Sequence, residues 1–221
     1  MKKDKQKIKQ KLVHWIVSKD NEKIIHFIEN DKDYHVNDIL NNMNETALIL
    51  AVRYNQELVP YLLGRGANVN IADYTNTQPL SYAIRYQVKM KNDIELLLKS
   101  GAIVDAGDDT GMTALHYACR SNMTCAEEDI KTLLEYGANV NLPSKNGMTP
   151  VMFLLANNNE KSLPLLLEYG ADIYAQDNKG RKILNFLKKD SPREKRVLSI
   201  IENFLLKKDY SNQNSKKHSI L

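Results

Sequence analysis

TALHYACRSNMTCAEEDIKTLLEYGA, residues 113–138, is the stretch that decides the fold of this 221-residue chain. It holds two apolar segments joined by a polar stretch, and the second segment contains Leu133-Leu134 shortly before Gly137-Ala138. Thr113 can cap the free N–H groups where the first helix begins. Gly137 can adopt the left-handed conformation that stops the second helix. The stretch therefore predicts two helices with defined ends.

The same pattern recurs along the chain. Four Gly-Ala dipeptides follow apolar runs, beginning at Gly66, Gly101, Gly137 and Gly170, with spacings of 35, 36 and 33 residues. The segments in register with Thr113 read Thr46-Ala47-Leu48, Gln78-Pro79-Leu80 and Thr149-Pro150-Val151. One helix pair cannot bury both of its faces, so the units are expected to stack in a row.

The repeated unit resembles the ankyrin repeat over about residues 38 to 187. In that family an inner helix opens with Thr-Pro-Leu-His, an outer helix ends in Leu-Leu, and Gly-Ala leads into the next loop. The resemblance implies an all-α fold, an ankyrin-repeat solenoid of stacked helix-turn-helix repeats joined by hairpin-like loops. It also implies a non-enzymatic module that binds another protein.

The departures from the family pattern carry expectations of their own. Only His116 keeps the family histidine, with Ile49, Ser81 and Met152 in the other three places. One hydrogen-bond network between loops is therefore expected to be intact, with packing replacing the others. Extra residues relative to the family unit fall between the helices of the second and third repeats, around 87–92 and 122–128.

The chain divides into three parts by composition. Residues 1–37 are predicted to form an N-terminal helical cap or degenerate repeat, with helices over 7–18 and 22–29. Residues 38–206 are predicted to hold four clear repeats and a degenerate C-terminal capping repeat, with helices over 183–187 and 197–206. Residues 207–221 have little apolar content and predict a basic disordered tail.

Partner-binding residues are carried over from the family by position. The exposed end of the inner helix gives Arg53-Tyr54, Arg85-Tyr86 and Arg120, a stripe expected along the concave face that suits a partner with an acidic surface. The alternative for these arginines is a solvated, helix-favouring role. Loop tips add further candidates, whose chemistry changes from one loop to the next: Tyr74, Asp109, Met112, Lys145 and Met148. Variable loop sequence alone would give the same change.

Catalytic, cofactor and metal sites are not predicted. His116, Cys119 and Cys125 are the one cluster that suggests a metal, and no fourth ligand stands at suitable spacing, so they are assigned to the repeat core. No phosphate-binding loop or nucleophile motif is present. Two modification or docking readings stay open: hydroxylation of Asn70 or Asn141, where the resemblance implies it, and capture of the C-terminal residues 219–221 by a PDZ domain.

Bulk properties agree with a folded protein. The chain is 43% hydrophobic and 26% charged with a net charge of +4, and no apolar run reaches the 18 residues of a membrane span. Two cysteines and no secretory signal predict a cytoplasmic protein, in a host cytosol if the source is an intracellular parasite.

Two alternative functions remain: an effector of an intracellular bacterium or large DNA virus that sequesters a host protein, and nucleic-acid or acidic-surface binding through the basic termini. Small-molecule substrates are not expected, nucleic acid is the weaker reading, and the chain is expected to be a monomer.

Overall fold

The computed structural model describes the backbone of residues 2–86, 92–121 and 126–218, and the side chains of 6–86, 93–121 and 126–208. The regular elements in these ranges are α1 (Lys2–Ser18), α2 (Asn21–Asn30), α3 (Ala47–Tyr54), η1 (Gln56–Leu58), α4 (Val59–Gly64), α5 (Pro79–Tyr86), α6 (Asn92–Lys99), α7 (Ala114–Arg120), α8 (Ala126–Glu135), α9 (Pro150–Ala156), η2 (Glu160–Ser162), α10 (Leu163–Glu168), η3 (Ile183–Phe186) and α11 (Pro192–His218). No strand occurs within these ranges, which confirms the all-α prediction.

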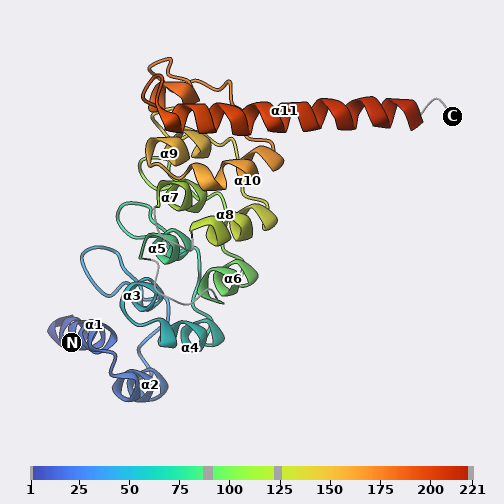
Figure 1. The fold of residues 1–221 in the computed structure, drawn as a ribbon. Coiled ribbons are helices and arrows are strands. Elements are labelled where there is room, and N and C mark those ends of the chain that lie inside the picture. The colour runs from blue at the N-terminus through green and yellow to red at the C-terminus, as the bar shows by residue number, and fades with distance from the viewer. Residues whose placement is uncertain (1, 87–91, 122–125, 219–221) are drawn as a thin grey trace.

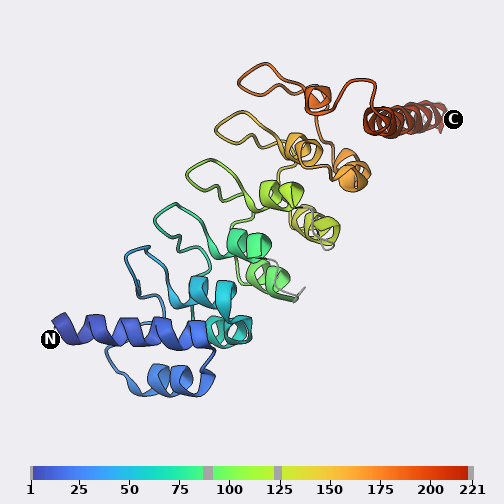
Figure 2. The same cartoon turned by 60° about the vertical axis from the view of Figure 1, so that its left-hand side comes forward.

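The helices form two rows joined by projecting loops (Figures 1 and 2). In the inner row, α1, α3, α5, α7, α9 and η3 each pack on the next. In the outer row, α6 packs on α8, α8 on η2, and α10 on α11. The loops that precede the inner helices project to the same side of the stack, and we call them fingers (Figure 2). The stacking predicted from the sequence repeat is therefore confirmed.

The outer helices end where the sequence places them. The glycines that follow the apolar runs all have positive φ: 84° at Gly66, 89° at Gly101, 85° at Gly137 and 86° at Gly170. At Gly137 an added Cβ would meet no other heavy atom within 4 Å, so glycine is required there by backbone conformation alone. Helix starts follow the threonines, and the Thr46 hydroxyl accepts a hydrogen bond from the Ile49 amide at 3.3 Å.

Neighbouring fingers are tied to one another by main-chain hydrogen bonds. Each finger turns at a residue with positive φ, namely Asn44, Asn76, Gly111, Gly147 and Gly180. Beside each turn after the first, an amide donates to a carbonyl of the preceding finger: Tyr74 to Met43 (3.0 Å), Asp109 to Thr75 (2.9 Å), Lys145 to Thr110 (2.9 Å) and Asn178 to Asn146 (3.1 Å). Because one bond joins each successive pair, the fingers are held in a fixed register.

An apolar core runs the length of the stack between the two rows of helices. Leu48, Leu62, Leu97, Leu115 and Leu133 are among its fully enclosed side chains. Burying a leucine of this kind contributes about 1.5–3 kcal/mol relative to leaving it exposed. Small residues let the inner helices approach: Ala51 and Ala118 are completely buried, whereas Ala83 is only half-buried.

The N-terminal end matches the prediction of two helices. α1 packs on α3 and on α2, so the pair covers the first repeat. Ile16, Ile24 and Ile28 are buried in this contact. Lys9 donates from Nζ to the carbonyl of Ile39 at 2.7 Å, so this terminal lysine fastens α1 to the first finger.

The C-terminal end corrects two predictions. The inner helix expected over 183–187 is a single 3-10 turn, η3, because the side-chain oxygen of Asn185 accepts the amide of Lys182 and Leu187 is already extended. The tail expected to be disordered from residue 207 is instead a continuation of α11 to His218, a stretch that contains no proline or glycine. Arg193 and Arg196 anchor the start of α11 through Glu160, at 2.9 and 3.0 Å.

The insertions expected around 87–92 and 122–128 fall largely on 87–91 and 122–125, which lie outside the described residues. In the described part of the chain, no helix is both long enough and apolar enough to cross a bilayer.

Candidate functional site on the inner-helix face

The predicted arginine stripe occupies equivalent positions at the ends of three inner helices. Arg53 and Arg85 are the next-to-last residues of α3 and α5, and Arg120 is the last residue of α7. Arg85 and Arg120 are exposed, whereas the side chain of Arg53 is 18% exposed. Tyr54 and Tyr86, at 38% and 42% exposed, lie beside them. We call the exposed surface of α3, α5, α7 and α9 the inner-helix face.

Each of the first two arginines packs against an aromatic side chain from the next repeat. The guanidinium of Arg53 lies 5.1 Å from the ring centroid of Tyr82, and that of Arg85 lies 5.0 Å from the ring of Tyr117. These cation–π contacts cross the repeat boundary and hold the arginines against the surface. Tyr82 and Tyr117 were not predicted as site residues, although an aromatic residue stands two places after the leucine in both repeats.

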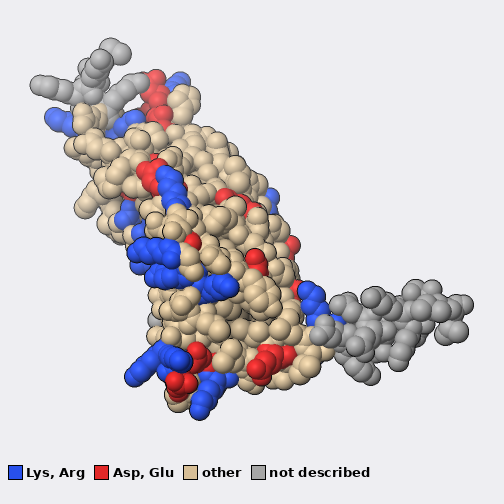
Figure 3. Space-filling model, turned by 90° about the horizontal axis from the view of Figure 1, so that it is seen from above, with Lys and Arg blue, Asp and Glu red and all other residues tan. Residues whose placement is uncertain are grey.

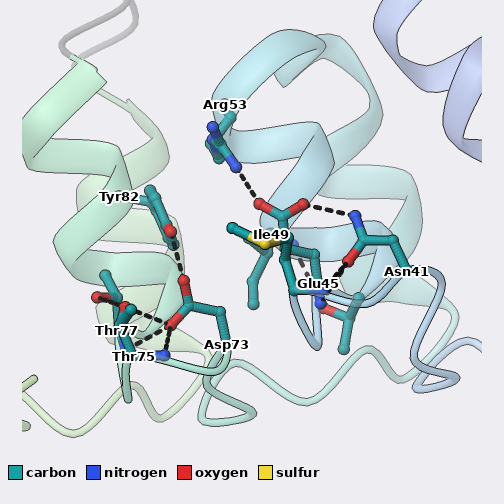
Figure 4. Close-up of polar contacts among 10 residues, drawn as sticks. Asn41, Glu45, Ile49, Arg53, Asp73, Thr75, Thr77 and Tyr82 are labelled. Atoms are coloured by element: carbon teal, nitrogen blue, oxygen red, sulfur yellow. Dashed lines mark hydrogen bonds and ion pairs between the residues drawn. The ribbon is translucent and has the colours of Figure 1, made fainter. Parts of the chain in front are cut away.

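In the first repeat, the arginine already has an acidic partner. Glu45 contacts Arg53 through one carboxylate oxygen and accepts a hydrogen bond from Asn41 Nδ2 at 2.6 Å through the other (Figure 4). The Glu45 side chain is only 5% exposed. Burial alone would lower the pKa of Arg53, but the Glu45 carboxylate together with Tyr54, Tyr82 and Tyr86 outweighs burial and raises that pKa. Arg53 therefore stays charged, and Glu45 balances its charge within the fold.

In the second and third repeats, an acidic finger residue contacts the aromatic residue instead. The hydroxyl of Tyr82 donates to Asp73 at 2.6 Å, and that of Tyr117 donates to Asp108 (Figure 4 shows the first pair). Burial and this carboxylate raise the pKa of Tyr117 to about 12. Although burial opposes it, hydrogen bonding from the hydroxyls and amides keeps the pKa values of Asp73 and Asp108 below their usual range. Packing alone thus does not replace the family histidine at Ser81, since a polar contact forms one residue further on.

The hydrogen-bond network predicted at His116 is confirmed. Its Nδ1 accepts from the amide of Thr113 at 3.1 Å, so Nε2 carries the proton and contacts the carbonyl of Met148 at 3.2 Å. Phe153 lies edge-on to the imidazole at 5.4 Å. Burial lowers the pKa of His116 to about 4. The ring therefore stays neutral and joins the third finger to the fourth.

The thiol next to this network is enclosed. Cys119 is completely buried, and burial raises its pKa. No group of three or more His, Cys, Asp or Glu within the described ranges is arranged to hold a metal ion. Cys125 lies outside those ranges.

The loop-tip candidates separate into exposed and enclosed residues. Tyr74 is 54% exposed, and Asp109 and Lys145 are exposed as well. Met112 is only 7% exposed and Met148 is half-buried, although each directly follows the glycine at the finger turn. The prediction that Met112 is available to a partner was wrong, and Met148 offers only part of its surface.

Asn70 and Asn141 link successive repeats. Asn70 donates to the carbonyl of Gly101 and accepts from the amide of Ile103, both at 2.9 Å. Asn141 makes the same pair of contacts with Gly170 and Asp172, at 2.9 and 2.7 Å. Both amide groups are thus engaged in holding the next repeat.

One face of the molecule carries its charged side chains in groups. On the face drawn in Figure 3, basic side chains form separate groups divided by uncharged surface, with acidic side chains beside several of them. Basic and acidic side chains are thus mixed on this face.

Comparison with known proteins gives a consistent result. A family model described as "Ankyrin repeats (3 copies)" matches residues 80–177, and one described as "Ankyrin repeat" matches residues 43–74. Together these matches cover more than half of the chain. An ankyrin repeat protein of fowlpox virus is 32% identical over 111 residues, which is 49% of this chain and 31% of the relative.

Two human proteins are also similar. Ankyrin repeat and SOCS box protein 6 is 37% identical over 118 residues, covering 50% of this chain and 28% of the relative. Transient receptor potential cation channel subfamily A member 1 is 28% identical over 142 residues, covering 63% of this chain and 12% of the relative. The chain thus spans less than a third of each of these relatives.

Proposed function

Because this chain belongs to the ankyrin-repeat family, whose repeats form protein-interaction modules, we propose that it binds a partner protein through the inner-helix face and the finger tips. The partner is a protein with an acidic surface, and the process involves no chemical step, cofactor or small-molecule substrate. We further propose that the chain acts as a monomer in the cytoplasm.

The observation that carries this proposal is a preformed row of exposed arginine and tyrosine side chains. Tyr54, Arg85, Tyr86 and Arg120 are exposed on consecutive inner helices, and cation–π contacts limit the freedom of Arg85. Arginine and tyrosine are the residue types that most often dominate binding energy at interfaces. Ordering these side chains before a partner arrives lowers the entropy cost of association.

A matched pair of cross-linking positions tests which face is used. Tyr86 on inner helix α5 and Tyr169 after outer helix α10 are both 42% exposed. We expect a photo-reactive phenylalanine at Tyr86 to cross-link the partner in the native cell, and the same residue at Tyr169 to give no cross-link. Cross-linking at Tyr169 with none at Tyr86 would assign binding to the other face.

A second candidate function has one observation in its favour. Relatives in fowlpox virus and variola virus are named as ankyrin repeat proteins, at 32% and 33% identity. An effector that sequesters a host protein would share the surface proposed here and differ in the source of its partner. Identification of the protein cross-linked at Tyr86 as a host protein would support this role, and a partner encoded by the same genome as this chain would remove it.

A further inference from the structure

In the first repeat, a carboxylate of the chain itself pairs with the arginine of the inner-helix face. Glu45 contacts Arg53, and the guanidinium of Arg53 also lies over the Tyr82 ring. Glu45 stands eight residues before Arg53, directly after the positive-φ residue of its finger. The carboxylate and the arginine therefore come from one repeat, whereas the ring comes from the next.

The second and third repeats keep the arginine but lack the carboxylate. The residues eight places before Arg85 and Arg120 are Thr77 and Met112, neither of which carries a charge. Within the described residues, no carboxylate pairs with Arg85 or Arg120. Four other arginines do pair: Arg53 with Glu45, Arg181 with Asp177, and both Arg193 and Arg196 with Glu160. The difference at this position is therefore specific to the two middle repeats.

These two arginines border one hollow. A depression of about 330 Å³ is lined by Ile84, Arg85, Tyr117, Arg120 and Ser121. Its lining combines two exposed guanidinium groups with the enclosed apolar side chain of Ile84. The nearby carboxylate of Asp108 already accepts hydrogen bonds from Tyr117, Thr110 and the Met112 amide, so its oxygens are committed to the finger.

We propose that the hollow between Arg85 and Arg120 binds a carboxylate side chain of the partner protein, in the role that Glu45 plays for Arg53. This inference rests on the proposed function, and it names Arg85 and Arg120 as the residues that recognise the charge of the partner. The ligand is an aspartate or glutamate in an acidic segment of the partner. Next along the inner-helix face, the fourth repeat presents half-buried Phe153 and exposed Ala156, so an apolar residue is expected beside the acidic one.

The test uses the full chain and a fluorescent glutamate decapeptide, with a glutamine decapeptide as the uncharged control, in anisotropy titrations at low salt. The Arg85→Gln, Arg120→Gln double variant is expected to weaken glutamate-peptide binding about tenfold, since two charge pairs that are only weakly screened at low salt are lost together. The double variant Arg65→Gln, Lys161→Gln changes the net charge by the same amount at exposed positions of the outer row, and its affinity should stay within about twofold.

A charge-neutral graft tests the role of the carboxylate. Asp73→Asn with Thr77→Glu reproduces the Asn41 and Glu45 pair of the first repeat beside Arg85 without changing the net charge. This variant should lose peptide affinity by the same factor as Arg85→Gln alone. Circular dichroism melts of each variant establish that the fold is retained, and Arg85→Gln alone tests the same charge if the graft does not fold.

Several results would overturn the inference. These are no binding of the glutamate peptide by the wild-type chain, equal losses in the Arg85/Arg120 variant and in its control, or an unaffected graft. A decapeptide of glutamine with one phosphoserine that binds far more tightly would assign the hollow to a phosphopeptide instead. The partner could cross-link at Tyr86 and yet bind with the same affinity to the chain and to its Arg85→Gln, Arg120→Gln variant. In that case this inference fails and the proposed function stands.

Discussion

The third and fourth repeats share one backbone plan but secure their inner helices by different chemistry. In the third, His116 links the Thr113 amide to the carbonyl of Met148 in the next finger. In the fourth, completely buried Met152 stands in the place of the histidine, and the Thr149 hydroxyl has no hydrogen-bond partner among the described residues. At this position of the inner helix, the same unit can therefore carry either a polar side chain that links two fingers or an apolar side chain that packs in the core.

This difference separates what each repeat contributes. A buried hydrogen-bond network fixes one geometry and adds modest net stability, because its groups lose their bonds to water. Apolar packing contributes more free energy but prescribes geometry less strictly. We expect perturbations of the fourth repeat to act on overall stability, and those of the third to act on its response to pH and on the register of the fingers.

The largest effect is expected from removing the packing of the fourth repeat. Met152→Ala leaves a cavity at a side chain with no exposed surface, and should lower the free energy of unfolding by about 2–5 kcal/mol. Urea denaturation followed by circular dichroism measures this change. Met152→Leu is the control, since it keeps the volume and should cost less than about 1.5 kcal/mol. A loss below 1 kcal/mol for the alanine variant would show that packing at Met152 does not secure this repeat.

The pH response should come from the third repeat. The pKa of His116 is about 4 in the folded chain and 6.5 in the unfolded chain, so unfolding is accompanied by proton uptake between these values. The stabilisation from neutral His116 is therefore complete above pH 6.5, declines as the pH falls, and is lost at about pH 4. The shift corresponds to about 3 kcal/mol.

The matched variant for this prediction is His116→Met, which gives the third repeat the residue of the fourth. The free energy of unfolding in urea is measured for both chains at each pH, and the value for the variant is subtracted from that of the wild-type chain. The subtraction cancels the titration of groups that both chains share, such as the carboxylate of Asp108. The difference should slope downwards from pH 6.5 to pH 4. A flat difference would mean that His116 is not held neutral by burial.

The smallest effect is expected from the capping threonines. Thr113→Val removes a hydroxyl that lies 3.0 Å from His116 Nδ1, and should cost about 1 kcal/mol. Thr149→Val removes a buried hydroxyl that has no partner in the described structure, so stability should change by less than about 0.5 kcal/mol or rise. Thermal melts of the two variants compare them directly. Equal losses at both positions would remove the distinction between the two repeats.

Features with local causes could be predicted from the sequence. The glycines at 66, 101, 137 and 170 end helices through their own backbone conformation, and His116 lies beside the threonine that it contacts. The family resemblance also located the arginines, because their position within the repeat is fixed by spacing. The repeat order and the inner-helix face follow from these signals.

Features that depend on how the chain turns back on itself could not be predicted in the same way. The burial of Met112 depends on how the finger turns back after Gly111, and the pairing of Glu45 with Arg53 depends on a distance across eight residues. One signal was available: an acidic residue follows the positive-φ Asn44, while Thr77 and Met112 occupy the same place in the next repeats. The length of α11 was missed because low apolar content does not prevent a helix that lacks proline and glycine after its start.

Hydrogen–deuterium exchange of the full chain, with and without the partner cross-linked at Tyr86, tests the central claim most directly. If the inner-helix face is the docking surface, the partner should slow exchange in α5 and α7 and at the tips of the second to fourth fingers, and leave α8 and α10 unchanged. Slower exchange confined to the outer helices or to the chain ends would contradict the account.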